Sequence, residues 1–209
     1  MSSASKGAQS PSGLCAAFQA NDPSHALYLT WAADGVNFQT PATCYPTMPI
    51  GSAPAAALYT DGMYLAYQAN DASHALCVAS SGDGANFDGP PTVYGGIQIG
   101  SAPAMAEFSD NLYVAFQAND PSNTLYITMS DDGDDFTTPA QGYGGIQIGS
   151  APAMAEFNGR LYIAFQANDP SHALYVTSSS DGVNFITPAQ GYGGIQIGSA
   201  PALCLVPSL

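Results

Sequence analysis

The sequence predicts an all-β protein: a four-bladed β-propeller of four 49-residue repeats with four-stranded antiparallel blades, its ring closed by the C-terminal strand. The tetrapeptide Ser-Ala-Pro-Ala begins at residues 52, 101, 150 and 199, in equal steps of 49. Glycine (22), proline (16) and tyrosine (12) are abundant among the 209 residues. This composition favours short strands and tight turns over helices.

Each repeat has the pattern of a four-stranded meander, most clearly in the last full repeat. Asn158-Gly159 is a hairpin signal between the first two strands, and Asp-Pro-Ser and Asp-Gly segments mark the later turns. The strands are expected at 151–157, 161–168, 173–179 and 185–190. Pro41, Pro90, Pro139 and Pro188 share one position inside the fourth strand. Proline is tolerated in a strand at an edge, so we expect the fourth strand at the outer edge of each blade.

The two ends of the chain predict how the ring closes. We expect one domain over residues 1–209, with repeats at 3–51, 52–100, 101–149 and 150–198 and a closing strand at 199–206. Residues 5–13 are unsuited to a buried first strand, whereas 199–206 repeat that strand without a blade of their own. The C-terminal strand should therefore complete blade 1, because an open array would leave it exposed. Alternatively, two chains could exchange strands to form a larger ring.

Charge and cysteine usage restrict the partners. The net charge is −14, with Lys6 and Arg160 as the two basic residues, so nucleic acid is not expected as a partner. No apolar run approaches the ~20 residues of a membrane span. The sequence begins without a signal-peptide pattern, which predicts a protein that is cytoplasmic or released without one. The expected oligomeric state is a monomer or a strand-exchanged or symmetric dimer.

The four cysteines occupy four different repeat positions and show no Cys-x-x-Cys spacing. Neither a zinc site nor a disulfide ladder is indicated, and no cofactor is expected. Ring closure would bring Cys15 and Cys204 onto neighbouring strands. Whether they face each other depends on the length of the hairpin turn, and we expect proximity without a disulfide.

Candidate binding residues gather on one face of the predicted ring. Successive turns alternate between the two faces, so the loop after the second strand and the connection to the next blade share one face, here called the loop face. Amides and carboxylates there suit sugar hydroxyls, and tyrosines followed by Gly-Gly offer an apolar ring beside open backbone. The candidates are Asn21, Asp22, His25, Asn70, Asp71, His74, Asn119, Asp120, Asn168, Asp169, His172, Tyr94, Tyr143, Tyr192, Gln98, Gln147 and Gln196.

Structural roles compete for several of these positions. Asn-Asp-Pro-Ser is also a good turn, and the preceding Gln19, Gln68, Gln117 and Gln166 could bridge backbone groups. The histidine position is occupied by Asn123 in the third repeat, so it is either an inert loop position or a polar ligand contact. In repeat 1 the connecting segment is Tyr45-Pro46-Thr47-Met48-Pro49, which lacks both glycines and the glutamine and should give a weak or absent site.

The stretch Ser-Ser-Asp-Gly-Val-Asn-Phe at 179–185 resembles the Asp-box of sialidase-like propellers, although it has one residue fewer between Asp and Gly, and Phe in place of the usual Trp. Its aspartate is expected to hydrogen-bond its own turn. Together with Ser-Ala-Pro-Ala and Asn-Gly-Arg-Leu-Tyr, the repeats resemble those of bacterial and fungal sialidase-like β-propeller lectins. That resemblance implies sugar sites in pockets between adjacent blades.

The sequence thus predicts a multivalent carbohydrate-binding protein, a lectin for glycans or glycoconjugates, and not an enzyme. A sialidase needs a cluster of three arginines, whereas the chain has Arg160 alone. Other glycosidases need two differently tuned carboxylates, but the only glutamates, Glu107 and Glu156, share one repeat position. The alternatives are a hemopexin-like metal- or haem-binding propeller and a structural or storage protein.

Overall fold

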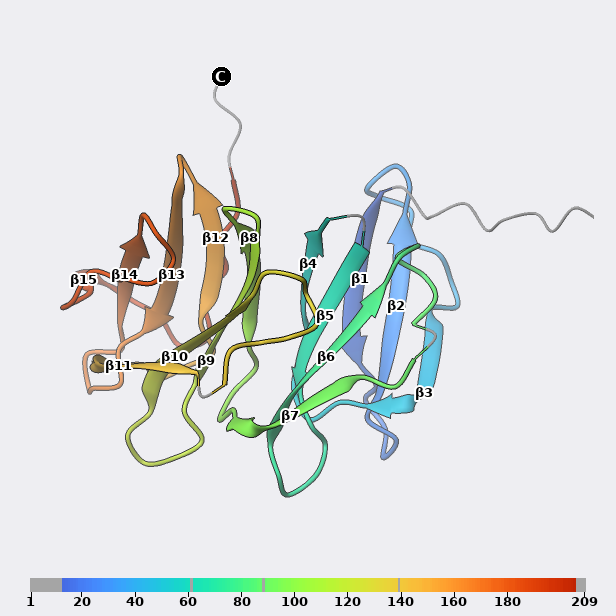
Figure 1. The fold of residues 1–209 in the computed structure, drawn as a ribbon, viewed down its shortest axis with the longest axis horizontal. Coiled ribbons are helices and arrows are strands. Elements are labelled where there is room, and N and C mark those ends of the chain that lie inside the picture. Colours follow the sequence, from blue (N-terminus) through green and yellow to red (C-terminus); the bar gives the residue numbers. More distant parts are fainter. Residues whose placement is uncertain (1–12, 61, 88, 139, 206–209) are drawn as a thin grey trace, which may run out of the picture.

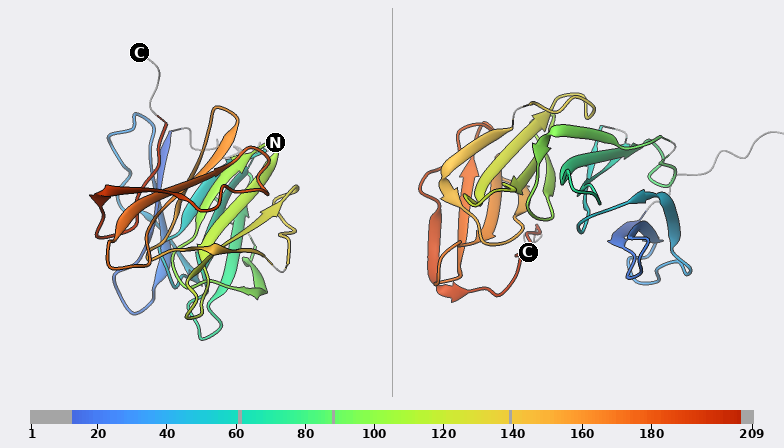
Figure 2. Two further views of the ribbon diagram at one scale, coloured as in Figure 1. Left: turned by 90° about the vertical axis from the view of Figure 1, so that its left-hand side faces the viewer. Right: turned by 90° about the horizontal axis from the view of Figure 1, so that it is seen from below.

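The computed structural model describes residues 13–60, 62–87, 89–138 and 140–205, and every regular element within them is a β-strand. The strands form four separate antiparallel sheets that stand side by side around an open arc (Figures 1 and 2). The predicted all-β, four-bladed propeller architecture is confirmed. Each repeat gives one sheet, or blade.

Blades 2, 3 and 4 each have four strands in the order of the chain, and the described part of blade 1 has three. Blade 1 contains β1 (Leu14–Gln19), β2 (Ala26–Ala32) and β3 (Thr43–Pro49), and blade 2 contains β4 (Ala55–Tyr59), β5 (Gly62–Gln68), β6 (Ala75–Ser81) and β7 (Thr92–Gln98). Blade 3 contains β8 (Ala104–Phe108), β9 (Asn111–Gln117), β10 (Thr124–Ser130) and β11 (Gln141–Gln147), and blade 4 contains β12 (Ala153–Phe157), β13 (Arg160–Gln166), β14 (Ala173–Ser179) and β15 (Gln190–Gln196).

The first two strands of a blade are joined by a two-residue turn. In blade 4, Phe157 pairs with Arg160 across Asn158-Gly159, whose φ angles are 51° and 69°. Positive φ at both positions is the geometry of the hairpin turns that suit twisted strands, and Asn-Gly is the favoured pair for it. The hairpin predicted here from the sequence is confirmed.

The fourth strand differs from the prediction. In blade 4 it is Gln190–Gln196, so it begins after Pro188 rather than containing it. The preceding segment is not paired as a strand, because its Phe185 side chain is buried between blades and its Ile186 carbonyl accepts a hydrogen bond from Thr177 Oγ1 at 2.8 Å. Pro41 and Pro90 likewise precede β3 and β7, and Pro139 lies outside the described residues.

Each fourth strand carries a bulge near its end. In blade 2, Leu76 pairs with Tyr94 but the neighbouring Ala75 pairs with Gln98, so Gly95, Gly96 and Ile97 leave the ladder. The same shift occurs in the other three blades. The segment expected to connect one blade to the next is therefore the end of the outer strand itself, bent by the bulge.

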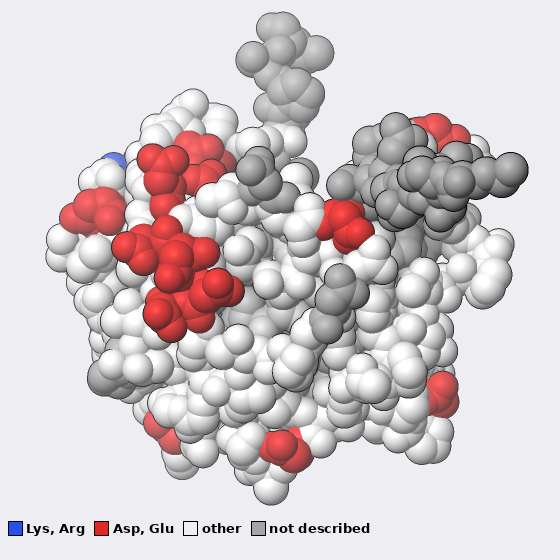
Figure 3. All heavy atoms as spheres, turned by 45° about the vertical axis from the view of Figure 1, so that its right-hand side comes forward, with Lys and Arg blue, Asp and Glu red and all other residues white. Residues whose placement is uncertain are grey.

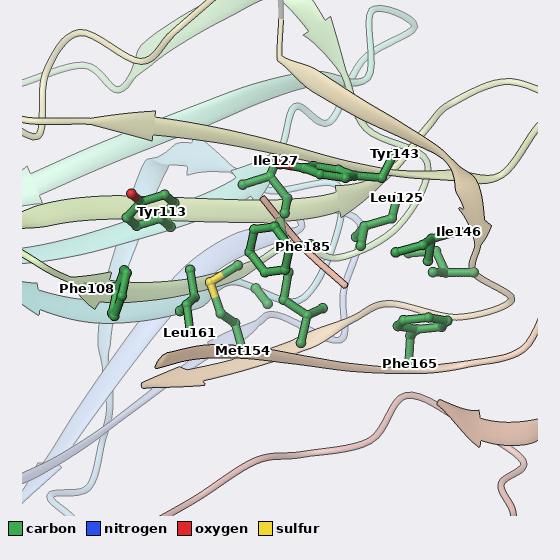
Figure 4. Close-up of a cluster of buried hydrophobic side chains, with 14 residues drawn as sticks. Phe108, Tyr113, Leu125, Ile127, Tyr143, Ile146, Met154, Leu161, Phe165 and Phe185 are labelled. Atoms are coloured by element: carbon green, nitrogen blue, oxygen red, sulfur yellow. The ribbon is translucent and has the colours of Figure 1, made fainter. Parts of the chain in front are cut away.

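The hydrophobic core is divided among the junctions between blades. One cluster joins blades 1 and 2, another blades 2 and 3, and a third blades 3 and 4. Figure 4 shows the third, in which Phe108 and Tyr113 of blade 3 lie near Met154 and Leu161 of blade 4. A tyrosine also bridges each junction: Tyr143 packs edge-to-face on Phe185 and donates its hydroxyl hydrogen to the Val183 carbonyl at 2.6 Å.

The predicted ring closure is not formed. Residues 201–205 belong to no strand, and Leu203, Cys204 and Leu205 line a cavity with Ala155, Phe157 and Tyr162 of blade 4 instead of pairing with β1. Blades 4 and 1 share no core cluster among the described residues, and the arc stays open between them (Figure 2). Cys204 is therefore not beside Cys15, and both thiols are free. The expectations for residues 5–12 and for Val206 lie outside the described residues.

Candidate functional site

Two equivalent grooves open on the loop face between neighbouring blades. The first groove, between blades 2 and 3, has a volume of about 360 Å³, and the second groove, between blades 3 and 4, about 170 Å³. The first is lined by Gly95, Gly96, Ile97, Gln98, Phe116, Ala118, Asn119, Asp120, Tyr126 and Ala140. The second is lined by Gly145, Ile146, Gln147, Phe165, Ala167, Asn168, Asp169, Tyr175, Pro188 and Ala189.

One wall of each groove is the glycine bulge of the outer strand. A Cβ atom added to Gly95 or Gly96 would meet no heavy atom within 4 Å, and neither residue has a positive φ. The same is true of Gly144 and Gly145. Because neither crowding nor backbone strain demands glycine at these positions, its effect is to leave bare backbone facing the groove, which a ligand can approach closely.

The opposite wall carries an aromatic ring that the sequence analysis did not select. Tyr126 stacks on Phe116 with ring centres 5.9 Å apart, and Tyr175 stacks on Phe165 at 6.0 Å. Gly142, paired with Tyr126, makes room for the ring, since an added Cβ would lie 2.7 Å from it. The sequence contained one signal for this ring. In blades 3 and 4 a tyrosine is paired with a glycine at these positions, whereas blade 2 has Cys77 and Val93.

The loop after the second strand supplies a carboxylate and an amide. Asp120 Oδ1 accepts a hydrogen bond from the Ser122 amide at 2.7 Å, and Asp169 accepts one from Ser171 at the same distance. Hydrogen bonds from the serine hydroxyl and amide lower the pKa of both carboxyl groups. Both aspartates are therefore ionised at neutral pH and act as hydrogen-bond acceptors rather than proton donors.

The grooves bring some of the sequence-predicted site residues together. Gln98 lies with Asn119 and Asp120 in the first groove, and Gln147 lies with Asn168 and Asp169 in the second. Their roles in binding remain predictions.

The predicted tyrosines have another position. Tyr94 donates its hydroxyl hydrogen to the Asp134 carbonyl and packs edge-to-face on Phe136. Tyr143 bridges blades 3 and 4 in the same way. These two rings hold neighbouring blades together, and neither is among the side chains that line the two grooves.

The remaining candidates lie elsewhere on the arc. Asn70, Asp71 and His74 belong to the loop of blade 2, beside the segment Tyr45–Pro49 of blade 1. This position, with Cys77 in place of the groove tyrosine, is here called the proline junction. Tyr192 and Gln196 lie on β15 of blade 4, whereas Asn21, Asp22 and His25 belong to blade 1 at the opposite end of the arc. The described residues of one chain thus do not assemble a fourth inter-blade groove.

The histidine position has a backbone explanation. His25, His74, Asn123 and His172 all adopt φ near 50° (49°, 50°, 48° and 48°), a region in which Asn and His are enriched among non-glycine residues. Their carbonyls accept hydrogen bonds at 2.9 Å from Ile50, Ile99, Ile148 and Ile197. The exchange of His for Asn in blade 3 therefore follows from backbone geometry without a ligand.

Two further repeated motifs are structural. Gln68 Nε2 donates to the Ile99 carbonyl at 2.5 Å, and the glutamines of the other three blades make the equivalent bond. Asp34 accepts from the Val36 and Asn37 amides at 2.9 and 2.7 Å, which closes its own turn. The other three Asp-box-like turns are closed in the same way.

Each groove lining contains one charged side chain, Asp120 in the first groove and Asp169 in the second. Figure 3 shows acidic side chains gathered in one region of the surface, with uncharged residues over much of the rest. Among the described residues, no three His, Cys, Asp or Glu side chains are grouped so as to hold a metal ion. The same part of the chain contains no helix long and apolar enough to cross a membrane.

Comparison with known proteins gives structural likeness alone. No protein-family model matches the sequence, and no curated protein matches it. Similar solved structures include an exo-β-1,3-galactanase from Phanerochaete chrysosporium with β-1,3-galactotriose (13% identity, TM-score 0.52, 79% of this chain and 43% of that one). A family 43 glycoside hydrolase from Xanthomonas citri with xylose gives 14% identity, a TM-score of 0.55 and coverage of 85% and 68%. A family 32 β-fructofuranosidase from Bombyx mori gives 13%, 0.55 and coverage of 88% and 49%.

These likenesses support a β-propeller fold, not sialidase-like lectin repeats in particular. They contradict the predicted lectin without catalytic activity, because the similar structures are glycoside hydrolases. The prediction that the chain is not an enzyme is corrected by the same finding. The chain spans about half the length of two of these three proteins, 43% of the galactanase and 49% of the fructofuranosidase.

Proposed function

We propose that the protein is a carbohydrate-active β-propeller that takes a neutral glycan as its substrate and holds it in the first and second grooves. The observation that carries this proposal is the pair of equivalent grooves, each with bare glycine backbone on one wall and a stacked tyrosine on the other. An aromatic ring packs against the apolar face of a sugar, while amides, carboxylates and backbone groups hydrogen-bond its hydroxyls.

The charge of the protein supports a neutral glycan. The chain has 16 acidic residues and a net charge of −14. Its one arginine, Arg160, donates hydrogen bonds to Ser178 Oγ on the turn side of blade 4, away from both grooves. An anionic sugar would therefore meet repulsion, and the residues that line the two grooves include no compensating cation.

The grooves explain substrate binding more fully than bond cleavage. Hydrolysis of a glycosidic bond commonly uses two carboxyl groups, one of them protonated. Each groove contributes one carboxyl group, Asp120 or Asp169, and both are ionised because their pKa is lowered. These aspartates suit the acceptor or base role, and a cleavage step would need a second, protonated acid.

The test uses β-1,3-galactotriose and xylotriose as probes, with calorimetry for binding and chromatography for released sugars. We expect at least one probe to bind and to be shortened on long incubation. Asp120→Asn with Asp169→Asn should weaken binding by about tenfold, through loss of charge-assisted hydrogen bonds.

Asp71→Asn is the matched control, because Asp71 accepts the same hydrogen bonds, here from the Ser73 amide and hydroxyl, but belongs to the proline junction. Binding in that variant should stay within about twofold of the parent protein. If neither probe binds, or if Asp71→Asn is as harmful as the double variant, the proposal is wrong. Binding without product release would leave the grooves as binding sites and contradict the proposed catalytic action.

A further inference from the structure

The outer face of blade 1 exposes side chains that the inner blades bury. Leu14 is 55% exposed and Phe18 is 41% exposed. The residues at the same repeat positions in blade 3, Leu112 and Phe116, are 0% and 2% exposed because they pack against blade 2. In blades 2, 3 and 4 this face packs against the preceding blade. In blade 1 the same face is exposed.

The outer face of blade 4 shows the complementary exposure. Phe157 and Ile195 are each 49% exposed. Their counterparts in blade 3, Phe108 and Ile146, are each 3% exposed because they pack against blade 4. In blades 1, 2 and 3 this face packs against the following blade. In blade 4 the same face is exposed. The two ends of the arc thus expose the two kinds of face that pack together at each of the three junctions within the chain.

The inner strand of blade 2 carries a further unmatched apolar group. Leu58 of β4 is 77% exposed, at the repeat position where blades 3 and 4 have the charged residues Glu107 and Glu156. An inner strand in blade 1 would lie beside β4, as β4 lies beside β8 and β8 beside β12. Residues 199–205 repeat the sequence of these inner strands, beginning with the same Ser-Ala-Pro-Ala.

We propose that two copies of the chain join head to tail, with blade 4 of each packed on blade 1 of the other. Residues 199–205 of each copy then form the inner strand of the other copy's blade 1, beside β1 and over Leu58. A head-to-tail contact that occurs twice closes into a two-fold ring and leaves no free end. Exchange between copies is favoured over closure within one chain because the chain's own segment stays beside the cavity at Phe157 and Tyr162 of blade 4 and does not reach β1 across the open arc (Figure 2).

The exchange would also assemble the groove that one chain leaves open. Tyr192–Gln196 of one copy would face Asn21, Asp22 and Tyr28 of the other, with Gly193 and Gly194 in the positions of Gly95 and Gly96. Tyr28 already stacks on Phe18 at 5.8 Å, as Tyr126 stacks on Phe116. Glycan binding by this composite groove rests on the proposed function, whereas the association of the two copies does not.

The first experiment measures molar mass by light scattering on a sizing column, without any sugar. We expect twice the 21.4 kDa of one chain, and a larger dimer fraction at higher salt, since each copy carries −14. Phe18→Asp and Ile195→Asp, on the two different faces, should each yield monomers. Val93→Asp is the control, because Val93 is 58% exposed on β7 of blade 2, which is at neither end of the arc.

The second experiment identifies which chain supplies the strand. In the register of β4 with β5, where Ala57 pairs with Tyr64, Cys204 would stand opposite Cys15. Opposed Cα atoms are about 4.5–5.5 Å apart, within reach of a disulfide. In a Cys44→Ser background, mild oxidation should therefore give a covalent dimer that Cys204→Ser abolishes.

Three results would overturn the proposal: a monomer whose oxidation links Cys15 to Cys204 within one chain, a monomer without that link, or a ladder of masses above the dimer. The first result would establish ring closure by the chain's own strand. None of the three depends on whether a glycan binds.

Discussion

The first groove and the proline junction share one backbone plan and differ in the residues that line it. Both are formed by a bulged outer strand facing the loop of the next blade, and both contain a buried apolar residue at the bulge, Ile97 or Met48. The groove has Gly95-Gly96 and Tyr126, whereas the junction has Pro46-Thr47 and Cys77. The residues that the two places share thus give the same packing between blades. The few residues that differ determine how open the backbone is to a ligand.

The largest effect is expected when the groove is given the junction's residues. Gly95→Pro, Gly96→Thr and Tyr126→Cys remove the bare backbone and the ring, while the inter-blade core is kept. Affinity for the probe sugar at the first groove should fall by about tenfold or more, about 1.4 kcal/mol. Calorimetry should show one fewer site per chain, and an unchanged number of sites would contradict the assignment.

The reverse exchange should create a site. Cys77→Tyr is combined with Val93→Gly, because Gly142 leaves the space that the Tyr126 ring fills in blade 3. With Pro46→Gly and Thr47→Gly added, the proline junction acquires the wall residues of the first groove. We expect one additional site per chain by calorimetry. A folded variant with no additional site would show that the walls alone are insufficient.

Two buried tyrosine hydroxyls provide a smaller contrast in stability. Within the described residues the Tyr67 hydroxyl, at the proline junction, has no hydrogen-bond partner, whereas Tyr143 donates to the Val183 carbonyl. Tyr67→Phe should stabilise the protein by about 1 kcal/mol, and Tyr143→Phe should destabilise it by a similar amount. In thermal unfolding this corresponds to shifts of about 2–4 °C in opposite directions. Shifts of the same sign would contradict the hydrogen-bond assignment.

The smallest effect concerns pH and the turns on the opposite face. Hydrogen bonds from the Asn37 and Val36 amides lower the pKa of Asp34 to about 2. Since the pKa is lower in the folded state than the usual ~3.9, the stabilisation is present above pH ~4 and is lost as the pH falls towards 2. Asp34→Ala should therefore lower the melting temperature at pH 7 but not at pH 2. Equal losses at both pH values would mean that the charge is unimportant.

The sequence predicted the fold better than the site. The 49-residue period and the Asn158-Gly159 hairpin were sufficient for the blades, because turn chemistry is local. The fourth strand was misplaced because the burial of Phe185 between blades is not visible along one repeat. The groove glutamines and aspartates were selected from their chemistry, but Tyr126 was missed because its role depends on pairing with Gly142 across two strands.

Ring closure and the tyrosine assignment failed for a related reason. A surplus strand indicates that an edge must be covered, but sequence alone does not say which chain covers it. Tyr94 and Tyr143 have the residue type expected of a sugar platform, yet each is held by a hydrogen bond to the next blade. The direction of a side chain at a bulge depends on how the strands pair and pack, so the repeat sequence alone does not show it.

The central claim is that glycans enter the first and second grooves, and amide chemical-shift mapping with β-1,3-galactotriose or xylotriose tests it most directly. The account predicts shifts concentrated at Gly95, Gly96 and Gly145, whose backbone lines the two grooves, with Thr47 of the proline junction unaffected. Shifts confined to the turns at Asp34 and Asp181 on the opposite face, or equal shifts at Thr47, would contradict it.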